Sequence, residues 1–168
     1  SIMKTFRPGR ERFLSREILV YGQFSSTIKT IPQLLDQGEN YFVTRYFENV
    51  LPTLNEMEKK ATIKRFTRQI LETMKKFYDY GYAIIGFYPG NIIITPKDEI
   101  KIIDFEFLYK YQVKPQHFSE SYDLVGVPEN FSGDMPLGDG NHTLENTWKP
   151  YLDMKIVKEF LGRENDRA

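Results

Sequence analysis

The sequence predicts an α+β fold, in which short antiparallel strands and helices occupy different parts of the chain. Two observations lead to this prediction. Apolar and polar residues alternate in short runs that turn residues separate, as in β-hairpins. Elsewhere, apolar residues recur every three or four positions, as on the buried face of a helix. The chain has 168 residues, a length that suits one domain with its own core.

The first part of the chain predicts a strand, a helix and a hairpin. Residues 2–6 alternate as a strand does. Apolar residues at helical spacing predict a helix over residues 10–23. The runs 32–35 and 41–46 flank a turn sequence at residues 38–40, so they are expected to pair as antiparallel strands.

The second part predicts a long helix, a second hairpin and a final helix. Over residues 54–77, apolar side chains keep to one face while lysine and arginine populate the other. Residues 91–95 and 100–105 predict the two strands of a hairpin. After residue 107 the pattern becomes irregular, and a helix over residues 152–161 follows.

Composition argues against several classes of function. Lysine plus arginine and aspartate plus glutamate balance at 23 each, so no global field favours nucleic acid or an anionic membrane. The lack of cysteine excludes disulfides, thiolate catalysis and thiolate metal sites. No apolar run is long enough to span a bilayer, and no signal-peptide pattern opens the chain. We therefore expect a cytoplasmic protein without a nucleic-acid partner.

Two motifs near the middle of the chain point to a chemistry. They are Gly86-Phe87-Tyr88-Pro89-Gly90-Asn91 and Ile102-Ile103-Asp104-Phe105-Glu106. In kinase-type phosphoryl transfer, a catalytic-loop Asp orients the attacking hydroxyl, an Asn five residues later binds metal, and an Asp after the next hairpin also binds metal. Asn91 and Asp104 fill the two metal positions, and Gly86 stands where the base is expected.

In this order along the chain, these features resemble the protein-kinase-like superfamily over residues 1–106. The resemblance implies a minimal two-lobed fold within a single domain, residues 1–168. Residues 1–48 would form a truncated small lobe of antiparallel strands and one helix. Residues 49–163 would form a small, mainly helical large lobe, and residues 164–168 a tail.

The resemblance also implies ATP and Mg²⁺ as cofactors and assigns residues to them. Lys4 would hold the α- and β-phosphates, with Glu17 as its ion-pair partner. Glu48 and Asn49 would belong to the hinge whose backbone meets the adenine. The two metal ligands would be Asn91 and Asp104. Outside this resemblance, Lys4 is interpreted as a solvated lysine of a strand and Glu17 as an exposed helical glutamate.

The loop is most similar to the small-molecule and atypical branch of the superfamily, which includes aminoglycoside, choline and lipopolysaccharide kinase-like proteins. These share a loop of the form His-Gly-Asp-Phe-His-Pro-Gly-Asn, followed by Ile-Asp-Phe-Glu. Here Ile84, Gly86 and Tyr88 replace the first His, the Asp and the second His. A positioned general base contributes about two to four orders of magnitude in rate, and glycine has no side chain to supply it.

Two further expectations concern charged residues near these motifs. Glu106 stands where typical kinases have glycine, which favours a fixed loop and an extra carboxylate beside the metal site. Arg10, Arg12 and Arg16 form one basic edge of the predicted helix and are interpreted as a solvated face.

Three functions remain open. The first is a pseudokinase, a nucleotide-binding, regulatory or scaffolding module without efficient phosphotransfer. The second is an active ATP-dependent phosphotransferase with a sugar, glycan or small-alcohol acceptor. The third is an unrelated α+β interaction domain. The family's Gly-rich loop would lie before Ser1, so the expected partners are a nucleotide and either a protein or an additional N-terminal segment.

Overall fold

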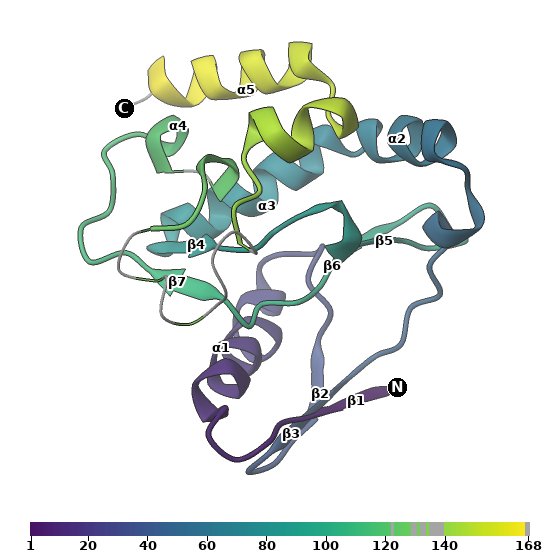
Figure 1. Ribbon diagram of the computed structural model, residues 1–168, viewed down its shortest axis with the longest axis vertical. Coiled ribbons are helices and arrows are strands. Elements are labelled where there is room, and N and C mark those ends of the chain that lie inside the picture. Colours follow the sequence, from purple (N-terminus) through teal and green to yellow (C-terminus); the bar gives the residue numbers. More distant parts are fainter. Residues whose placement is uncertain (122, 129–130, 132–133, 135–139, 167–168) are drawn as a thin grey trace. The chain divides into compact units, whose positions relative to one another are not determined.

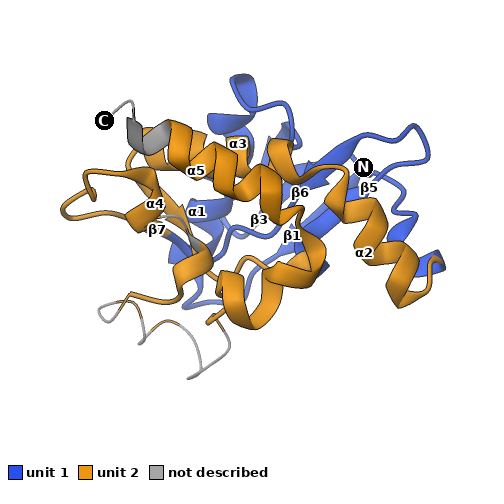
Figure 2. Ribbon diagram, turned by 90° about the horizontal axis from the view of Figure 1, so that it is seen from above, with its two compact units in different colours: residues 1–53, 90–108 blue, residues 54–89, 109–168 orange. Residues whose placement is uncertain are grey.

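A computed structural model of the chain describes residues 1–121, 123–128, 131, 134 and 140–166. The chain divides into two compact units, which Figure 2 colours separately. Unit 1 contains residues 1–53 and 90–108, and unit 2 contains residues 54–89 and 109–168 as far as they are described. Short antiparallel strands and separate helices, labelled in Figure 1, confirm the predicted α+β class.

Unit 1 contains a three-stranded antiparallel sheet with the order β1-β3-β2. The edge strand β1 (Ile2–Thr5) pairs with the central strand β3 (Tyr41–Thr44), so that Lys4 lies opposite Phe42. The strand β2 (Leu34–Gln37) pairs with the other side of β3. The predicted first strand and first hairpin are therefore both present.

Helix α1 (Glu11–Gly22) packs against β2 and β3 and is one residue shorter at each end than predicted. Its buried residues include Phe13, Leu14 and Tyr21, as the helical spacing of apolar residues predicts. They also include Glu17, whose side chain is 1% exposed. A carboxylate on a buried helix face needs a partner, because an unpaired charge is costly to remove from water.

The second hairpin consists of β5 (Ile92–Ile94) and β6 (Ile100–Ile102), as predicted. It belongs to unit 1, since backbone hydrogen bonds join it to earlier segments. The N–H of the last β6 residue donates to the Thr30 carbonyl at 2.8 Å, and the last β5 carbonyl accepts from the Val50 N–H at 2.9 Å. The resemblance implies a large lobe that begins at residue 49 and includes this hairpin, whereas these bonds group it with the first strands.

In unit 2, α2 (Glu56–Lys64) and α3 (Thr67–Asp79) stand in place of the one long predicted helix. That prediction is wrong at residues 65–66, and the break has a local cause. The Thr67 hydroxyl donates to the last carbonyl of α2 at 2.7 Å and accepts the Asp153 N–H at 2.9 Å. These side-chain bonds compete with the helical ladder at this point.

Unit 2 is completed by shorter elements and a last helix. These are β4 (Tyr82–Ile84), which pairs with β7 (Leu108–Lys110), and the helices α4 (Phe118–Ser121) and α5 (Met154–Asp166). Helix α5 packs on α3 and α4. It includes residues 164–166, which the sequence analysis assigns to the tail, and residues 167–168 lie outside the described part.

Short turns of other helix types connect these elements. The 3₁₀ turns are Phe24–Ser26, Leu51–Thr53, Pro89–Asn91, Asp123–Val125 and Lys149–Tyr151, and a π-helical turn is Leu144–Trp148. In the described part of the chain, no helix combines the length and the apolar character that crossing a membrane requires.

Candidate functional site

Lys4 and Glu17 form an ion pair in unit 1. The Lys4 Nζ donates to the Glu17 Oε1 at 2.9 Å, so strand β1 and helix α1 are joined by the pair that the resemblance implies. The Lys4 side chain is 37% exposed, whereas the Glu17 side chain is 1% exposed. The cost of burial therefore falls mainly on the carboxylate.

The protonation properties of the pair follow from this unequal exposure. Burial raises the pKa of Glu17 from 4.5 to about 7, and Lys4 opposes this shift without cancelling it. Burial lowers the pKa of Lys4, but the attraction of Glu17 and the hydrogen bond to Glu106 outweigh it, so the pKa of Lys4 is raised. The ammonium group is thus kept charged beside a carboxylate that binds a proton easily.

Asp104 follows β6 and lies in the same cluster as the ion pair. Its φ is 75°, in the left-handed region that non-glycine residues rarely adopt, and its N–H donates to the Tyr21 hydroxyl at 3.1 Å. The residue as a whole is exposed, but protein atoms around its carboxyl group exclude part of the water. This desolvation raises the pKa of Asp104. Lys4 lowers this pKa and Glu106 raises it further.

Glu106 supplies a third carboxylate to this cluster. Its Oε1 lies 2.5 Å from the Lys4 Nζ, and its side chain is 18% exposed. Among the described residues, Glu17, Asp104 and Glu106 each offer a carboxylate oxygen, and these atoms lie within 4.8 Å of one another. Mg²⁺ prefers oxygen ligands of this kind, so the chemistry of the donor set fits the cofactor that the resemblance implies.

Asn91 is buried and lies next to this cluster along the hairpin. Its backbone carbonyl accepts the Ile103 N–H at 3.0 Å, which continues the β5–β6 ladder by one residue pair. The residue is 5% exposed. The hairpin therefore brings Asn91 opposite the residue that precedes Asp104, and its role as a metal ligand stays a prediction.

The predicted hinge residues lie between β3 and the first 3₁₀ turn that follows it. The Asn49 Oδ1 accepts the N–H groups of Leu51 and Ile94, each at 3.2 Å. Its side chain thereby holds this connection against β5. Glu48 is exposed. A contact of this backbone with adenine stays a prediction.

Residues 86–89 of the loop that would carry the catalytic base belong to unit 2. Gly86 has a φ of 76°, a conformation that glycine adopts without strain. The next residue, Phe87, is 2% exposed, and its carbonyl accepts the indole N–H of Trp148 at 3.0 Å. Tyr88 stacks on the His142 ring, with centroids 5.0 Å apart. The loop is therefore held in place by residues of the irregular C-terminal region.

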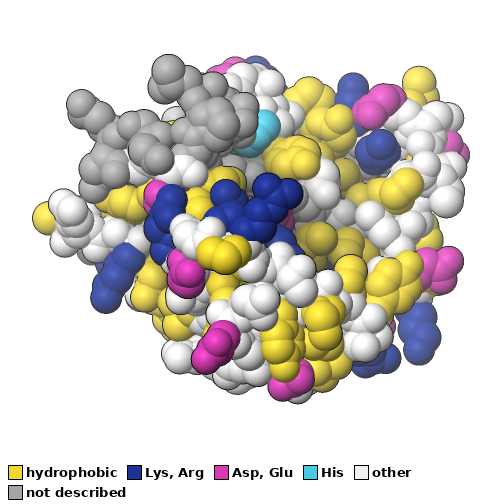
Figure 3. Space-filling view, turned by 60° about the horizontal axis from the view of Figure 1, so that its bottom comes forward, with side chains coloured by type: hydrophobic (Ala, Val, Ile, Leu, Met, Phe, Trp, Pro, Cys, Tyr) yellow, Lys and Arg dark blue, Asp and Glu magenta, His cyan; other side chains and the backbone are white. Residues whose placement is uncertain are grey.

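Arg10, which precedes α1, and Arg16, which lies in it, are not simply part of a solvated face, so that interpretation is wrong for these two residues. The Arg10 Nη2 lies 3.6 Å from the Glu106 Oε2, and the Arg16 Nη1 donates to the Glu106 carbonyl at 3.0 Å. With Arg12, they also lie around the Phe13 ring, their guanidinium carbons 4.2 to 5.4 Å from its centroid. Basic side chains gather on the face seen in Figure 3. Neither these contacts nor the hydrogen bond to the Tyr21 hydroxyl is predicted from the sequence.

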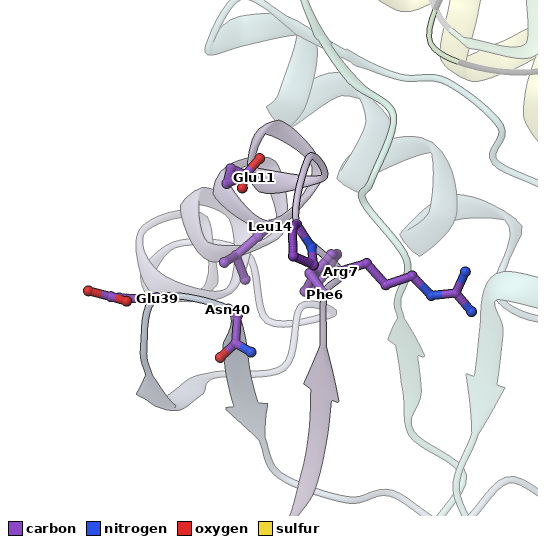
Figure 4. A pocket seen from close by; sticks show the side chains of 7 residues that line it. Phe6, Arg7, Glu11, Leu14, Glu39 and Asn40 are labelled. Carbon is purple, nitrogen blue, oxygen red and sulfur yellow. The ribbon is translucent and has the colours of Figure 1, made fainter.

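Unit 1 also contains a cavity of about 190 Å³, shown in Figure 4. Its lining residues come from the β1–α1 connection, α1 and the β2–β3 turn, and they are Phe6, Arg7, Pro8, Glu11, Leu14, Glu39 and Asn40. None of these is a predicted site residue. In Figure 4 the Arg7 side chain points away from Glu39 and Asn40, so the cavity does not gather its charged groups around one point.

Comparison with known proteins bears on the kinase resemblance. No family model matches the chain. Over 60 residues the chain is 33% identical to the chloroplastic serine/threonine-protein kinase STN8 of Arabidopsis thaliana. This stretch is 35% of the present chain and 12% of the kinase, so the chain spans about an eighth of the length of this relative. The similarity supports a kinase-like relationship for this chain.

Proposed function

We propose that this chain is a kinase-like module that binds a magnesium nucleotide and transfers its phosphate poorly or not at all, so that its role is regulatory or scaffolding. The observation that carries the proposal is the ion pair between Lys4 and Glu17, with Asp104 in the same cluster. Three separate segments of the chain supply these groups. In protein kinases a Lys–Glu pair and a metal-binding Asp must both be in place for phosphoryl transfer.

Each group has a defined part in nucleotide binding under this proposal. Lys4 binds phosphate oxygens, and Glu17 orients its ammonium group. Asn91 and Asp104 hold Mg²⁺, which neutralises charge on the phosphate oxygens when it is bound. The backbone of residues 48–49 meets the adenine. The proposal extends to ATP because the Lys–Glu pair of kinases serves the α- and β-phosphates of that nucleotide.

Weak phosphate transfer follows from the predicted catalytic loop. Gly86 occupies the position of the base and has no side chain to accept a proton. Ile84 and Tyr88 occupy the positions of the two histidines. Phosphoryl transfer depends largely on positioning and electrostatics, so binding without efficient turnover is chemically consistent with these replacements.

Nucleotide binding is tested by calorimetric titration with ATP in the presence and absence of Mg²⁺. Binding of Mg-ATP is expected for the unaltered protein, and Asp104→Asn is expected to weaken it about ten- to a hundredfold, because a charged metal ligand becomes neutral. Asn tolerates the left-handed backbone of this position, so the fold is retained.

Asp98→Asn is the matched control for this variant. Asp98 also has a positive φ, 62°, and lies in the turn of the same hairpin, outside the cluster. Its replacement is expected to leave the affinity unchanged. Equal affinities of Asp104→Asn and the unaltered protein would remove the metal role of Asp104, and absence of Mg-ATP binding to the unaltered protein would overturn the proposed function.

Gly86→Asp tests the loss of the catalytic base. Turnover of ATP is expected to change less than about tenfold, whereas a working base would raise it by about two to four orders of magnitude. The reason is that the two histidines of the loop are also replaced. Gly86→Asn is the control, since it has a similar size and no proton acceptor of comparable strength. A hundredfold advantage of Asp over Asn in single-turnover assays would show that the rest of the site is competent.

An active phosphotransferase with a sugar, glycan or small-alcohol acceptor is the second candidate, and one observation favours it. The stacking of His142 on Tyr88 brings an imidazole to the predicted loop, with its Nδ1 3.2 Å from the Thr147 hydroxyl. Histidine is the most common general base. Phosphorylation of such an acceptor that is lost in His142→Gln would favour this candidate over a pseudokinase.

A further inference from the structure

Glu106 is held by positive groups on several sides. Its Oε1 contacts the Lys4 ammonium at 2.5 Å, and its Oε2 lies 3.6 Å from the Arg10 guanidinium. Its backbone carbonyl accepts a hydrogen bond from Arg16 at 3.0 Å. The side chain is only 18% exposed. Arg16 thus anchors the main chain of Glu106, while Lys4 and Arg10 share its carboxylate.

The Lys4 ammonium group already has two carboxylate partners. An ammonium group has three hydrogen-bond donors, and here Glu17 and Glu106 both lie within ion-pair distance of it. A phosphate that approaches Lys4 meets the carboxylates of Glu17, Asp104 and Glu106 around one ammonium. Like charges at such distances repel one another, and the repulsion is strong where water is partly excluded.

We propose that Glu106 is an internal competitor of the nucleotide phosphate for Lys4. This inference rests on the proposed function and adds regulation of the same site. A phosphate oxygen takes the place of the Glu106 Oε1 on the Lys4 ammonium. The displaced carboxylate stays paired with Arg10, which already faces its other oxygen.

The exchange depends on the unequal burial of the two carboxylates that contact Lys4. Glu106 is 18% exposed and has Arg10 as a second partner, 3.6 Å from its Oε2. Glu17 holds Lys4 from the other side and, at 1% exposure, is fixed in the core. Exchange therefore moves Glu106 and leaves the Lys4–Glu17 pair intact. Mg²⁺ favours the exchange because it offsets the negative charge that the phosphate adds.

Calorimetric titration of three variants with ATP, with and without Mg²⁺, tests the proposal. Glu106→Gln is expected to bind Mg-ATP about three- to tenfold more tightly than the unaltered protein, because a charged competitor becomes neutral. Metal-free ATP is expected to gain at least as much. Arg10→Gln removes the alternative partner and is expected to weaken binding about threefold. The double variant is expected to bind as Glu106→Gln does.

Two controls match the charge changes. Glu39→Gln removes an exposed carboxylate in the β2–β3 turn, and Arg12→Gln removes a guanidinium two residues after Arg10, in the first turn of α1. Neither is expected to alter the affinity. If Glu106→Gln does not fold, the affinities of Arg10→Gln and Arg12→Gln for Mg-ATP still test the exchange. Arg10→Gln is then expected to bind more weakly than Arg12→Gln.

The outcomes separate the two proposals. If the unaltered protein binds Mg-ATP and Asp104→Asn weakens it, but Glu106→Gln binds equally or more weakly, the competitor role is wrong and the proposed function stands. If only Glu106→Gln binds nucleotide, the competitor role gains support, whereas nucleotide binding by the unaltered protein, and with it the proposed function, is overturned. If no variant binds nucleotide, both proposals fail.

Discussion

Replacing Lys4 with methionine is expected to lower the free energy of unfolding by about 3 kcal/mol at pH 8. The reason lies in Glu17, which is 1% exposed and loses the ammonium group 2.9 Å away. Removing one partner of a buried ion pair costs about 3 to 5 kcal/mol, and the lower value applies because Lys4 itself is 37% exposed. Methionine keeps most of the side-chain volume, so packing changes little.

The same variant is expected to lose much less stability at pH 5. Glu17 can then take up a proton, because burial raises its pKa to about 7 even with Lys4 present. A neutral carboxyl group does not need the ammonium partner. A loss that depends on pH in this way identifies the buried charge, and not lost packing, as the cause.

Urea unfolding followed by far-UV circular dichroism measures this effect. The single tryptophan, Trp148, lies in unit 2, so its fluorescence does not report directly on the Lys4 site. Lys97→Met, at an exposed lysine of the β5–β6 turn, is the control and should change stability little. In a Glu17→Gln background Lys4→Met should cost less than about 1 kcal/mol. An equal cost in both backgrounds would contradict the explanation.

The hairpin of the candidate site is a feature that local sequence patterns can predict, whereas the pairing of Lys4 with Glu17 is implied only by the resemblance to the kinase-like superfamily. Glu17 follows Phe13 and Leu14 on a strongly periodic helix, and a lysine precedes that helix on an alternating strand. The β5–β6 hairpin has apolar strands on either side of a polar turn, and this pattern predicts how the two strands pair. Because paired strands bring their ends together, the pairing places Asn91 close to Asp104 along the backbone.

The remaining contacts of the site could not be predicted in this way. The Tyr21 hydroxyl meets a backbone N–H 83 residues later, and Arg16 meets a carbonyl 90 residues later. Helical spacing places Tyr21 on the buried face and Arg16 on a basic edge, but it carries no information on distant partners. Such contacts depend on how α1 packs against the hairpin, which is a property of the tertiary fold.

Two differences in the fold have the same origin. The break after α2 depends on the Thr67 hydroxyl, which bonds both the preceding helix and Asp153. The grouping of the β5–β6 hairpin with unit 1 depends on backbone bonds to Thr30 and Val50. Apolar periodicity continues through residues 65–66, so pattern alone predicts an unbroken helix there, and the lobe boundary near residue 49 is implied by the resemblance alone.

Stability is expected to fall as pH rises from about 4.5 to about 7, by an amount that Glu17→Gln removes. The folded protein keeps a proton on Glu17 up to about pH 7, whereas the unfolded chain releases it near pH 4.5. Between these values the folded state binds more protons, so raising the pH favours unfolding. The difference between 4.5 and about 7, at about 1.36 kcal/mol per pH unit, corresponds to about 3 kcal/mol.

This direction is opposite to that of a carboxylate whose ion pair outweighs its burial, for which stability is lost as the pH falls. The pH profile therefore tells which effect dominates at Glu17. Unfolding free energies at pH 5 and pH 8 are expected to differ by about 2.5 kcal/mol less in Glu17→Gln than in the unaltered protein. Asp104 shifts in the same direction and its carboxylate lies within 4.8 Å of that of Glu17, so the difference between the two proteins includes the coupling between these groups.

Glu99→Gln, at an exposed carboxylate of the β5–β6 turn, is the control and should follow the profile of the unaltered protein. Parallel profiles for Glu17→Gln and the unaltered protein would mean that Glu17 keeps an ordinary pKa in the folded state. Lys4 would then compensate the buried carboxylate fully, and the loss in Lys4→Met would persist at pH 5. Lys4→Met and Glu17→Gln each change one partner of the ion pair. Together they show whether the Glu17 carboxyl group is charged or protonated near neutral pH.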